Sequence, residues 1–594
     1  MKRILICSLM CAAVTAHASD GTWNGSVGGN AGPADVGRNW SATSNWVGSI
    51  VGGTVGTTTS PDTLFMSTAG HYTITLDNNY NIKNAWHNSN PHRHAIVQTN
   101  GTSVLSLTSG GSITGNGNVM YYTPIRLEGG SGGSYALAVA GPLMIYGPMV
   151  GTATAGGNYT LILSGLSANE SDFTFSGSYV GSLADGSGGG SLSVLQTNGF
   201  WNMNSANSYS GPTTVRNGHM KFGNAVSPFG TNIIVLGDSG TVSGDSIELE
   251  HANNGTLNCN IIVNSNNVTG TTMISVRNNL GTPTFGGTIT LSRTITVYAV
   301  NSGTPTFTGV ISGPGGIIKS GVNFARLQNA NTYTGDTTMS DGELRLKHVN
   351  AIQNSTLDMG VAGSQFVTFD LSGNNIYNLG GLKGTNNLAI GGNTISVGAN
   401  NKTTTYYGVI SGAGGAFTKV GTGILTVNTN TYSGATTVSA GTLLINGWLS
   451  TTTSTVTVSA NGTLGGTGTI QRAVSVQSGG TLRGGIPGAV GTLTIVSNVT
   501  MAANTQVACD LANGAMSTIN ILGSLTLPTA GTVTVTRGTG RLISGPTALI
   551  TASGNITCPS ISGWTVLPAG GYTLSLTTTQ FLLQPRSGFV FMVD

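Results

Sequence analysis

Apolar and polar residues alternate with a period of two in many short segments of the chain, and glycine-rich turns separate these segments. The alternation is clear at residues 72–77, 103–107, 159–163 and 172–175. Such alternation predicts strands with one buried face, and no segment keeps an apolar period of 3.6 residues over three turns. The pattern therefore predicts an all-β chain.

A long repeat lies within this pattern. Residues 309–346 and 408–446 share GVISGxGG, then Asn-x-Asn-Thr-Tyr, whose Tyr opens Tyr-[Ser/Thr]-Gly-x-Thr-Thr, and a Gly nine residues after the Tyr. A third copy begins later in the frame, at residue 207. The aligned positions are Asn207, Asn331 and Asn430, then Tyr209, Tyr333 and Tyr432, then Gly218, Gly342 and Gly441.

A shorter repeat indicates the pitch of the fold. The sequence GTPTFGG at residues 281–287 returns as GTPTFTG at residues 303–309, twenty-two residues later. Fixed periods in the twenties indicate a solenoid, and this period suits one turn of a parallel β-helix with three short strands. In that fold we expect Val438 inside the coil and the repeated asparagines stacked in ladders at turns. The repeated glycines would supply turn conformations that a Cβ atom penalises.

Composition supports an ordered solenoid. Glycine accounts for 92 of 594 residues, and charged residues for only 7%, where about 25% is usual. Disorder requires high charge with low hydrophobicity, which is not the case here. An ordered β protein with frequent glycine turns is therefore predicted.

The N-terminus has the pattern of a secretory signal peptide. Lys2 and Arg3 precede an apolar run at residues 4–14, and Ala-His-Ala at residues 16–18 forms a cleavage site. Removal of residues 1–18 leaves a net charge near +1, which predicts no nucleic-acid partner. No later run reaches the roughly 18 apolar residues of a membrane helix, so no transmembrane segment is expected after the signal.

The expected domains follow from these patterns. They are a signal peptide at 1–18, an N-terminal cap with the first coils at 19–94, a parallel β-helix at 95–525 and a C-terminal β cap at 526–594. Trp23, Trp40 and Trp46 suggest a covered N-terminal end, and aromatic residues with denser alternation suggest antiparallel hairpins near the C-terminus.

The repeats resemble the autotransporter-associated β-strand repeat proteins. The matching motifs are GVISGxGG, NTYSGATTVSAGTLLI, the NGTLGGTGTI to GTLTI continuation, and the tryptophan segment at residues 40–65; together they cover most of residues 21–500. The resemblance implies an all-β, right-handed parallel β-helix of the passenger type, at the cell surface of a bacterium or secreted from it. Only 99 residues follow Ile495, so no translocating barrel is expected in this chain.

Acidic residues and one serine are the candidates for catalytic groups. Gly-Asp-Ser-Gly at residues 237–240 resembles a serine-protease motif preceded by His71 and Asp77, but its place between two apolar segments favours a turn. Lyases and glycoside hydrolases need paired carboxylates with basic partners. The nearest acidic groups are Glu170 with Asp172, Asp245 with Glu248 and Glu250, and Asp341 with Glu343. No Arg-Lys-His set lies beside them in sequence, so no catalytic, cofactor-binding or metal-binding residue, and no cofactor, is predicted.

Histidine and cysteine offer two further alternatives. His87, His92 and His94 form the densest histidine cluster, with a polar loop as the main interpretation and a transition-metal site as the alternative. Cys259, Cys509 and Cys558 are too few and too scattered for a disulfide framework. The sequence leaves open whether Cys509 and Cys558 form a bridge or stay buried and reduced.

The leading hypothesis is a secreted or surface-exposed structural or adhesive β-solenoid without enzymatic activity. The first alternative is a carbohydrate-binding solenoid in which Tyr121-Tyr122 or Tyr406-Tyr407 stack on sugars, although alternation predicts that one tyrosine of each pair points inward. The second is a polysaccharide lyase or hydrolase. Surface glycans and further copies of the chain are the expected partners.

Overall fold

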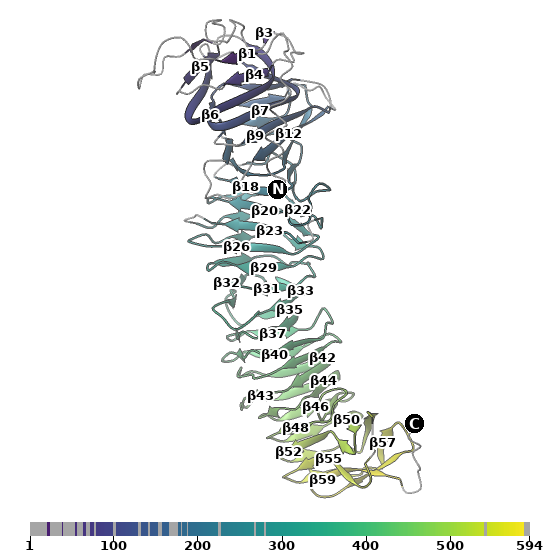
Figure 1. Cartoon of the computed structure of the whole chain (residues 1–594). Coiled ribbons are helices and arrows are strands. Elements are labelled where there is room, and N and C mark those ends of the chain that lie inside the picture. The colour runs from purple at the N-terminus through teal and green to yellow at the C-terminus, as the bar shows by residue number, and fades with distance from the viewer. Residues whose placement is uncertain are drawn as a thin grey trace. The chain divides into compact units, whose positions relative to one another are not determined.

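The computed structural model describes five short segments before residue 79 and most of residues 79–586. The described residues are 21–23, 38–39, 54–55, 63–66, 72–76, 79–98, 103–128, 132–139, 143–151, 157–165, 176–179, 181–186, 188–223, 227–266, 269–277, 281–539 and 543–586. The predicted signal peptide, Trp40, Trp46, His71, Asp77, Glu170 and Asp172 lie outside them. All regular elements in these residues are β-strands, as predicted (Figure 1). None of them forms a helix that could cross a membrane.

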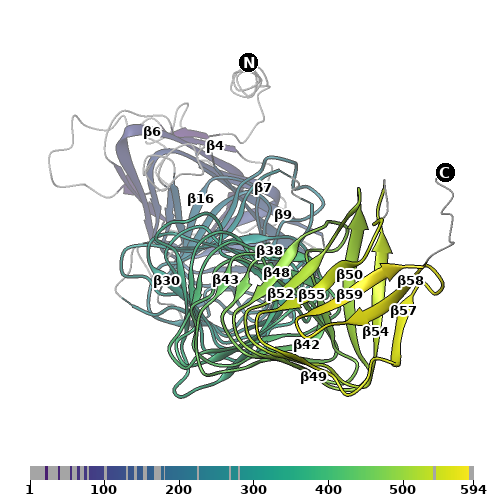
Figure 2. The same cartoon turned by 90° about the horizontal axis from the view of Figure 1, so that it is seen from below.

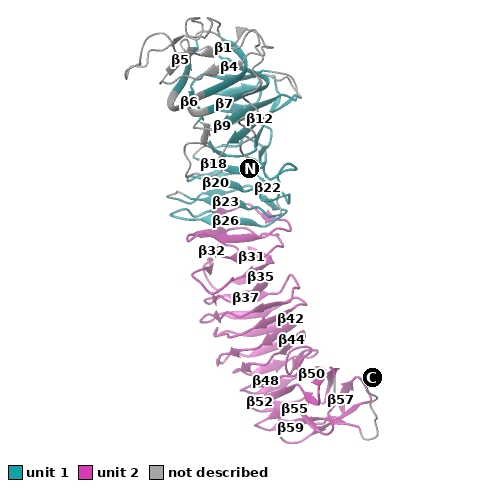
Figure 3. Ribbon diagram, in the orientation of Figure 1, with its two compact units in different colours: residues 1–305 teal, residues 306–594 magenta. Residues whose placement is uncertain are grey.

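Residues 1–305 make up one compact unit, which is teal in Figure 3. One column of parallel strands contains β16 (Phe200–Met203), β18 (Gly218–Phe222), β20 (Ile247–His251), β23 (Thr272–Val276) and β26 (Ile295–Ala299). A second contains β17 (Thr213–Val215), β19 (Ile234–Leu236), β22 (Ile261–Val263) and β25 (Ile289–Leu291). Because each strand pairs with the strand one coil later, this unit is a parallel β-helix.

Residues 306–594 make up the second compact unit, which is magenta in Figure 3. Its first column contains β37 (Thr394–Val397), β40 (Ala416–Lys419), β42 (Thr436–Ile445), β44 (Val456–Gly465), β46 (Val474–Val476), β49 (Val499–Met501), β53 (Leu525–Thr526) and β56 (Ile556–Thr557). The long strands β42 and β44 bend into a second column with β47 (Thr481–Arg483), β50 (Thr505–Ala512), β54 (Ala530–Arg537) and β57 (Gly563–Leu567). A third contains β43 (Trp448–Leu449), β45 (Thr469–Ile470), β48 (Thr492–Ile495), β52 (Thr518–Ile521) and β55 (Thr547–Ala552).

The core of the second unit is the set of side chains that alternate inward from these strands. Val438 pairs with Val458, and Val458 pairs with Val476, so the three valines stack in consecutive coils. All three are almost completely buried, and the predicted interior position of Val438 is confirmed. Hydrogen bonds between coils and apolar stacking within them are therefore the two forces that hold this fold.

The predicted spacing of twenty-two residues between adjacent coils is found at the GTPTF repeat but does not hold along the whole described chain. Gly281 pairs with Gly303 in a parallel bridge, which places the two GTPTF segments in adjacent coils as predicted. Elsewhere the spacing changes: Val456 pairs with Val474, eighteen residues on, whereas Leu525 pairs with Ile556, thirty-one residues on. Turns and loops absorb the extra residues while the strands remain in register.

The repeated tyrosines explain the long repeat. Tyr209, Tyr333 and Tyr432 are buried, and their hydroxyls lie 2.5, 2.6 and 2.8 Å, respectively, from the hydroxyl of the threonine four residues later. The glycine nine residues after each tyrosine has a φ of 99, 66 and 66° respectively. Side chains with a Cβ atom avoid this conformation, so glycine is needed at these turns.

The repeated asparagines hold coils together in a different way from the expected ladder. Asn331 accepts a hydrogen bond from the amide of Ile311 (2.8 Å) and donates one to the carbonyl of Ala351 (3.0 Å). Asn207 makes the equivalent bonds with Leu183 and Pro228, at 2.7 and 2.6 Å. The prediction of stacked asparagines at these positions is wrong, because each of these two bridges the main chains of the preceding and following coils.

Pairing near the two ends of the described chain is mixed. Parallel pairing continues past residue 525 to β57, and β59 (Gln580–Pro585) then pairs antiparallel with β58 (Tyr572–Leu576) and β55 (Figure 2). Near the N-terminus, β4 (Thr63–Met66) and β5 (Tyr72–Leu76) pair in parallel with β6 (Tyr80–Gln98), whereas β3 (Thr54–Val55) pairs with it antiparallel.

The cysteines of the described chain form no disulfide. Cys509 is buried in β50, and Cys259 and Cys558 are half-buried. Burial raises the pKa of the Cys509 thiol to about 12. A bridge between Cys509 and Cys558 is absent, and the alternative of buried, reduced thiols holds for Cys509.

Candidate functional site

A cluster of charged side chains lies on the outer side of the first unit. His219 and Lys221 on β18 stand directly beside Glu248 and Glu250 on β20, because the two strands pair in this register. Arg277 follows β23 in the next coil. Alternation along the strands turns these polar groups away from the core, while Met220, Leu249 and Ile274 are buried inside it.

Glu248 is held by groups from the following coil. Arg277 Nε and Nη2 lie 2.6 and 2.9 Å from Oε1 and Oε2 of Glu248, and the Ser275 hydroxyl donates to Oε1 at 2.5 Å. Burial raises the pKa of Glu248, but the hydrogen bonds from Arg277 and Ser275 and the neighbouring His219 outweigh it and hold the pKa below its ordinary value. Glu248 is therefore a carboxylate whose two oxygens are both occupied.

Glu250 is fully buried despite its outward direction. Its Oε2 lies 2.8 Å from His219 Nε2, and its Oε1 lies 3.2 Å from Lys221 Nζ. The ring of Phe200 packs edge-to-face on His219, with centroids 4.8 Å apart. A polymeric substrate has no access to this carboxylate, because its exposed fraction is 0%.

The ligand atoms of His219, Glu248 and Glu250 lie within 4.8 Å of one another, which is suitable spacing for a metal ion. The charges fit such an ion poorly. Lys221 and Arg277 already balance the two carboxylates, so a divalent cation would leave a net positive charge in a buried site. The arrangement is best suited to joining three coils through ion pairs.

The acidic residues of this cluster have basic neighbours, which the sequence analysis did not predict. The carboxylates at residues 248 and 250 do have a Lys, an Arg and a His beside them, although none is close in sequence. The relevant pattern is His-x-Lys on β18 in register with Glu-x-Glu on β20, followed by Ser275 in register with Glu250 and by Arg277 just after β23. Stacking brings Arg277 to Glu248 across 29 residues of sequence.

The ion pair between Glu248 and Arg277 makes stability sensitive to acid. Since the pKa of Glu248 is lower in the folded chain than in the unfolded chain, its contribution is present above pH about 4.5 and is lost as the pH falls through the folded pKa. We expect Glu248→Gln to reduce the loss of stability between pH 7 and pH 3, measured by urea denaturation. Glu128→Gln is the control, and an equal effect of both variants would contradict the prediction.

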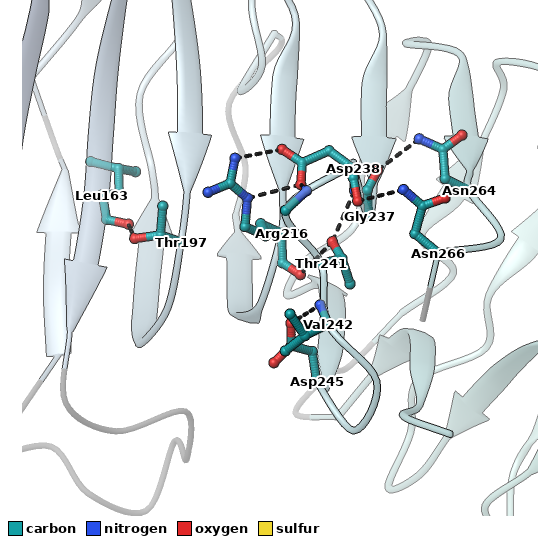
Figure 4. A network of polar contacts seen from close by, with 11 residues as sticks. Leu163, Thr197, Arg216, Gly237, Asp238, Thr241, Val242, Asp245, Asn264 and Asn266 are labelled. Carbon is teal, nitrogen blue, oxygen red and sulfur yellow. Dashed lines mark hydrogen bonds and ion pairs between the residues drawn. The ribbon is translucent and has the colours of Figure 1, made fainter. Parts of the chain in front are cut away.

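The Gly-Asp-Ser-Gly segment is a turn that links three coils (Figure 4). Asp238 receives two hydrogen bonds of 2.8 Å from Arg216 of the preceding coil. Asn264 and Asn266 of the following coil donate to the carbonyls of Gly237 and Asp238, both at 2.7 Å. Asp238 therefore has a structural role, and the predicted turn is confirmed.

The remaining candidate residues are in structural contacts. Glu343 accepts hydrogen bonds from Arg345 at 2.7 and 3.0 Å and from Thr368 at 2.6 Å. His87 and His94 lie inside the coil, with ring centroids 5.9 Å apart, and burial together with the charge of His94 lowers the pKa of His87 well below its usual value. These two histidines are not in an exposed loop as expected; the side chain of His92 lies outside the described residues.

The tyrosine pairs alternate as predicted. Tyr121 and Tyr406 are buried, whereas their neighbours Tyr122 and Tyr407 are 40% and 62% exposed. Tyr122 also stacks on Tyr146 of the next coil, with centroids 4.7 Å apart and planes 3° from parallel. The outward tyrosines are therefore the ones that a ligand can reach.

A comparison with known protein families identifies the type of the repeat. The family model described as "Passenger-associated-transport-repeat" matches residues 199–218, 318–346 and 417–445. The chain therefore contains repeats of the autotransporter passenger type. Each matched segment contains the turn around a repeated tyrosine, so the passenger-type repeat coincides with the interlocking Tyr, Thr and Gly positions described above.

A curated relative adds a partial match. Over 139 residues, or 22% of this chain, the sequence is 33% identical to a protein named "Adhesin BmaC autotransporter" from Brucella suis biovar 1 (strain 1330). The match spans 4% of the length of that relative. Because the match covers so little of that relative, the activity of the whole relative does not transfer with it.

Proposed function

We propose that this protein is a bacterial cell-surface or secreted structural and adhesive solenoid without enzymatic activity. The observation that carries the proposal is the passenger-type repeat, whose regular residues are structural: the tyrosine and threonine bond to each other within a coil, and Asn331 joins the coils before and after it. A relative named as an adhesin supports the adhesive role. The pairing of Glu248 with Arg277 and of Glu250 with Lys221 supports the absence of catalysis, as does the complete burial of Glu250.

Adhesion can be tested with beads that carry the purified chain. We expect the beads to adhere to host-type cell layers or glycan-coated surfaces more than beads carrying heat-denatured chain, because an intact solenoid presents its side faces as a continuous surface. The same preparation should not degrade polysaccharides. Polysaccharide turnover that disappears in Glu248→Gln or Glu250→Gln would contradict the non-enzymatic role and favour a lyase or hydrolase.

Carbohydrate binding is the second candidate function, and the exposed aromatic side chains favour it. Sugar rings stack on aromatic faces, and Tyr407 and the Tyr122–Tyr146 pair are exposed. Tyr407 is the informative position for substitution. Tyr406 is unsuitable, because its hydroxyl donates to the carbonyl of Asn386 at 2.5 Å inside the coil.

A further inference from the structure

One outer face of the second unit carries an unbroken column of hydroxyl side chains, which we name the threonine ladder. Its members pair one above another through eight successive strands of the first column, β37 to β56. They are Ser396, Thr418, Thr437, Thr457, Ser475, Thr500, Thr526 and Thr557. With strands about 4.8 Å apart, eight hydroxyl groups are presented along about 34 Å.

The ladder residues remain in register although the coils differ in length. Thr457 and Ser475 are eighteen residues apart, and Thr526 and Thr557 are thirty-one, yet each pair is in direct register. Buried residues on both sides of the ladder positions from Ser396 to Thr526, and Ile556 before Thr557, fix this register, since a shift by one residue would turn them outward. Loops at the ends of the strands absorb the difference.

The hydroxyl groups of the ladder are available for a ligand. Ser475 Oγ accepts a hydrogen bond from Gln477 (2.7 Å), and none of the six threonines makes a side-chain hydrogen bond to another described residue. The third column differs. Thr492 and Thr518 are bonded to each other at 2.8 Å, and Thr551 donates to Asn520 at 3.0 Å.

The face around the ladder carries no charge. No ladder residue is charged, and neither is any residue two positions before or after one. In the second column, by contrast, Arg483 and Asp510 form an ion pair on adjacent strands. An uncharged face gives no attraction to nucleic acid, anionic lipid or acidic polysaccharide.

We propose that the threonine ladder binds a neutral polysaccharide laid along the stack of coils. One hydroxyl-to-hydroxyl hydrogen bond contributes little in water, so a single sugar would bind weakly. A polymer with regularly repeated hydroxyls engages many ladder positions at once, and each bond after the first forms at high effective concentration. This inference rests on the proposed surface role and deepens it by naming the ligand class.

Neither strand propensity nor self-association accounts for the whole ladder. Threonine is favoured on exposed strands, which explains the residue type. Strand propensity does not explain why the neighbouring positions are uncharged or why the threonine hydroxyls have no hydrogen-bond partner among the described residues. A second copy of the chain would bring only threonine methyl groups to the contact, and so little apolar area would be buried. A chain of neutral sugars matches both the hydroxyls and the lack of charge.

The experiment compares two triple variants of the full chain. Thr437→Val, Thr457→Val and Thr500→Val together remove three ladder hydroxyls and keep the branched shape. The control triple, Thr442→Val, Thr463→Val and Thr481→Val, makes the same change in the second column, whose threonines also pair in register. The probes are cellulose powder and dextran as neutral polymers and alginate as the acidic one, with retention measured by co-sedimentation or calorimetry.

We expect the wild type and the control triple to bind a neutral polymer, and the ladder triple to bind it at least about tenfold more weakly. Binding of neither neutral polymer, equal loss in the two triples, or equal retention of alginate would overturn the inference. Self-association that is lost in the ladder triple would instead assign the face to a second copy. Bead adhesion is scored separately, so loss of adhesion with intact polymer binding would affect only the proposed function.

Discussion

Val458→Asp is expected to destabilise the second unit strongly. Val458 lies between Val438 and Val476 in the stacked interior, and all three side chains have almost no exposed surface. A carboxylate there would be paired with an apolar side chain in each adjacent coil. An uncompensated buried charge costs about 3–5 kcal/mol, which is a large part of the stability of an ordinary domain.

Val438→Asp should cost less than Val458→Asp, which makes the comparison informative. Val438 pairs with Lys419 of the preceding coil, and the side chain of Lys419 also points inward. An aspartate at 438 would therefore have an ammonium group nearby, whereas one at 458 would not. The difference between the two variants tests the register of three consecutive coils.

Denaturation in urea followed by circular dichroism measures both changes, with Thr457→Asp as the matched control on the outer face of the same strand. The control should stay within about 0.5 kcal/mol of the wild type, because surface substitutions usually have small effects. If Val458→Asp and Thr457→Asp were equally stable, the assignment of Val458 to the inner face and Thr457 to the outer face of β44 would be wrong. Hydrogen exchange should show the loss centred on the substituted coil, since solenoid coils interact with their nearest neighbours.

The fold could be predicted from the sequence because its causes are local and repeated. Alternation predicts one inward and one outward tyrosine in each pair, and the structure places Tyr121 and Tyr406 inside. The glycine nine residues after each repeated tyrosine is predicted to be a turn residue for a conformational reason, and its positive φ confirms it. Each of these inferences needs only a few adjacent residues.

The contacts between coils could not be predicted in the same way. His219, Glu248 and Arg277 meet because coils of different length stack in register, and no fixed spacing in the sequence identifies them as neighbours. The asparagines are recognisable as a repeat, but their role depends on which main-chain groups lie above and below. The interpretation of Glu248 and Glu250 as acids without basic neighbours is wrong for this reason.

Buried cations illustrate the same limit. Lys319 and Lys419 occupy equivalent places in two copies of the long repeat, and no sequence pattern marks either of them as buried. Lys419 donates to the carbonyls of Val420, Gly421 and Ala440 at 2.6, 2.9 and 3.3 Å. Lys319 has the same arrangement, with Ser320, Gly321 and Asp341. A cation satisfied by main-chain carbonyls leaves no partner side chain for a sequence pattern to show.

Arg472 is another cation buried in this way, and its removal should destabilise the second unit. Its guanidinium donates to the carbonyls of Ser450 at 2.8 Å, Gly434 at 2.6 Å and Tyr432. Only 1% of its surface is exposed, and burial lowers its pKa. Within the described residues no carboxylate pairs with it, so these carbonyls of two earlier coils provide its main stabilisation.

We expect Arg472→Met to lose about 3 kcal/mol of unfolding free energy. Each buried carbonyl left without a donor costs about 1–3 kcal/mol, and relief of the buried charge offsets part of the total. Replacing a whole ion pair by apolar residues can be neutral, but here the partners are main-chain groups that remain after the substitution. Arg472→Lys should fall in between, because one ammonium group cannot reproduce the forked geometry of the guanidinium.

Urea denaturation with Lys402→Met as the control separates this effect from a general loss of positive charge. Lys402 is half exposed and pairs with Asp336 at 3.4 Å on the surface, so its removal should change stability by less than about 1 kcal/mol. If Arg472→Met were as stable as the wild type, the carbonyls of Tyr432, Gly434 and Ser450 would have to find other donors. The guanidinium would then not be what joins these coils, and the stability of this region would have to come from strand pairing and apolar stacking.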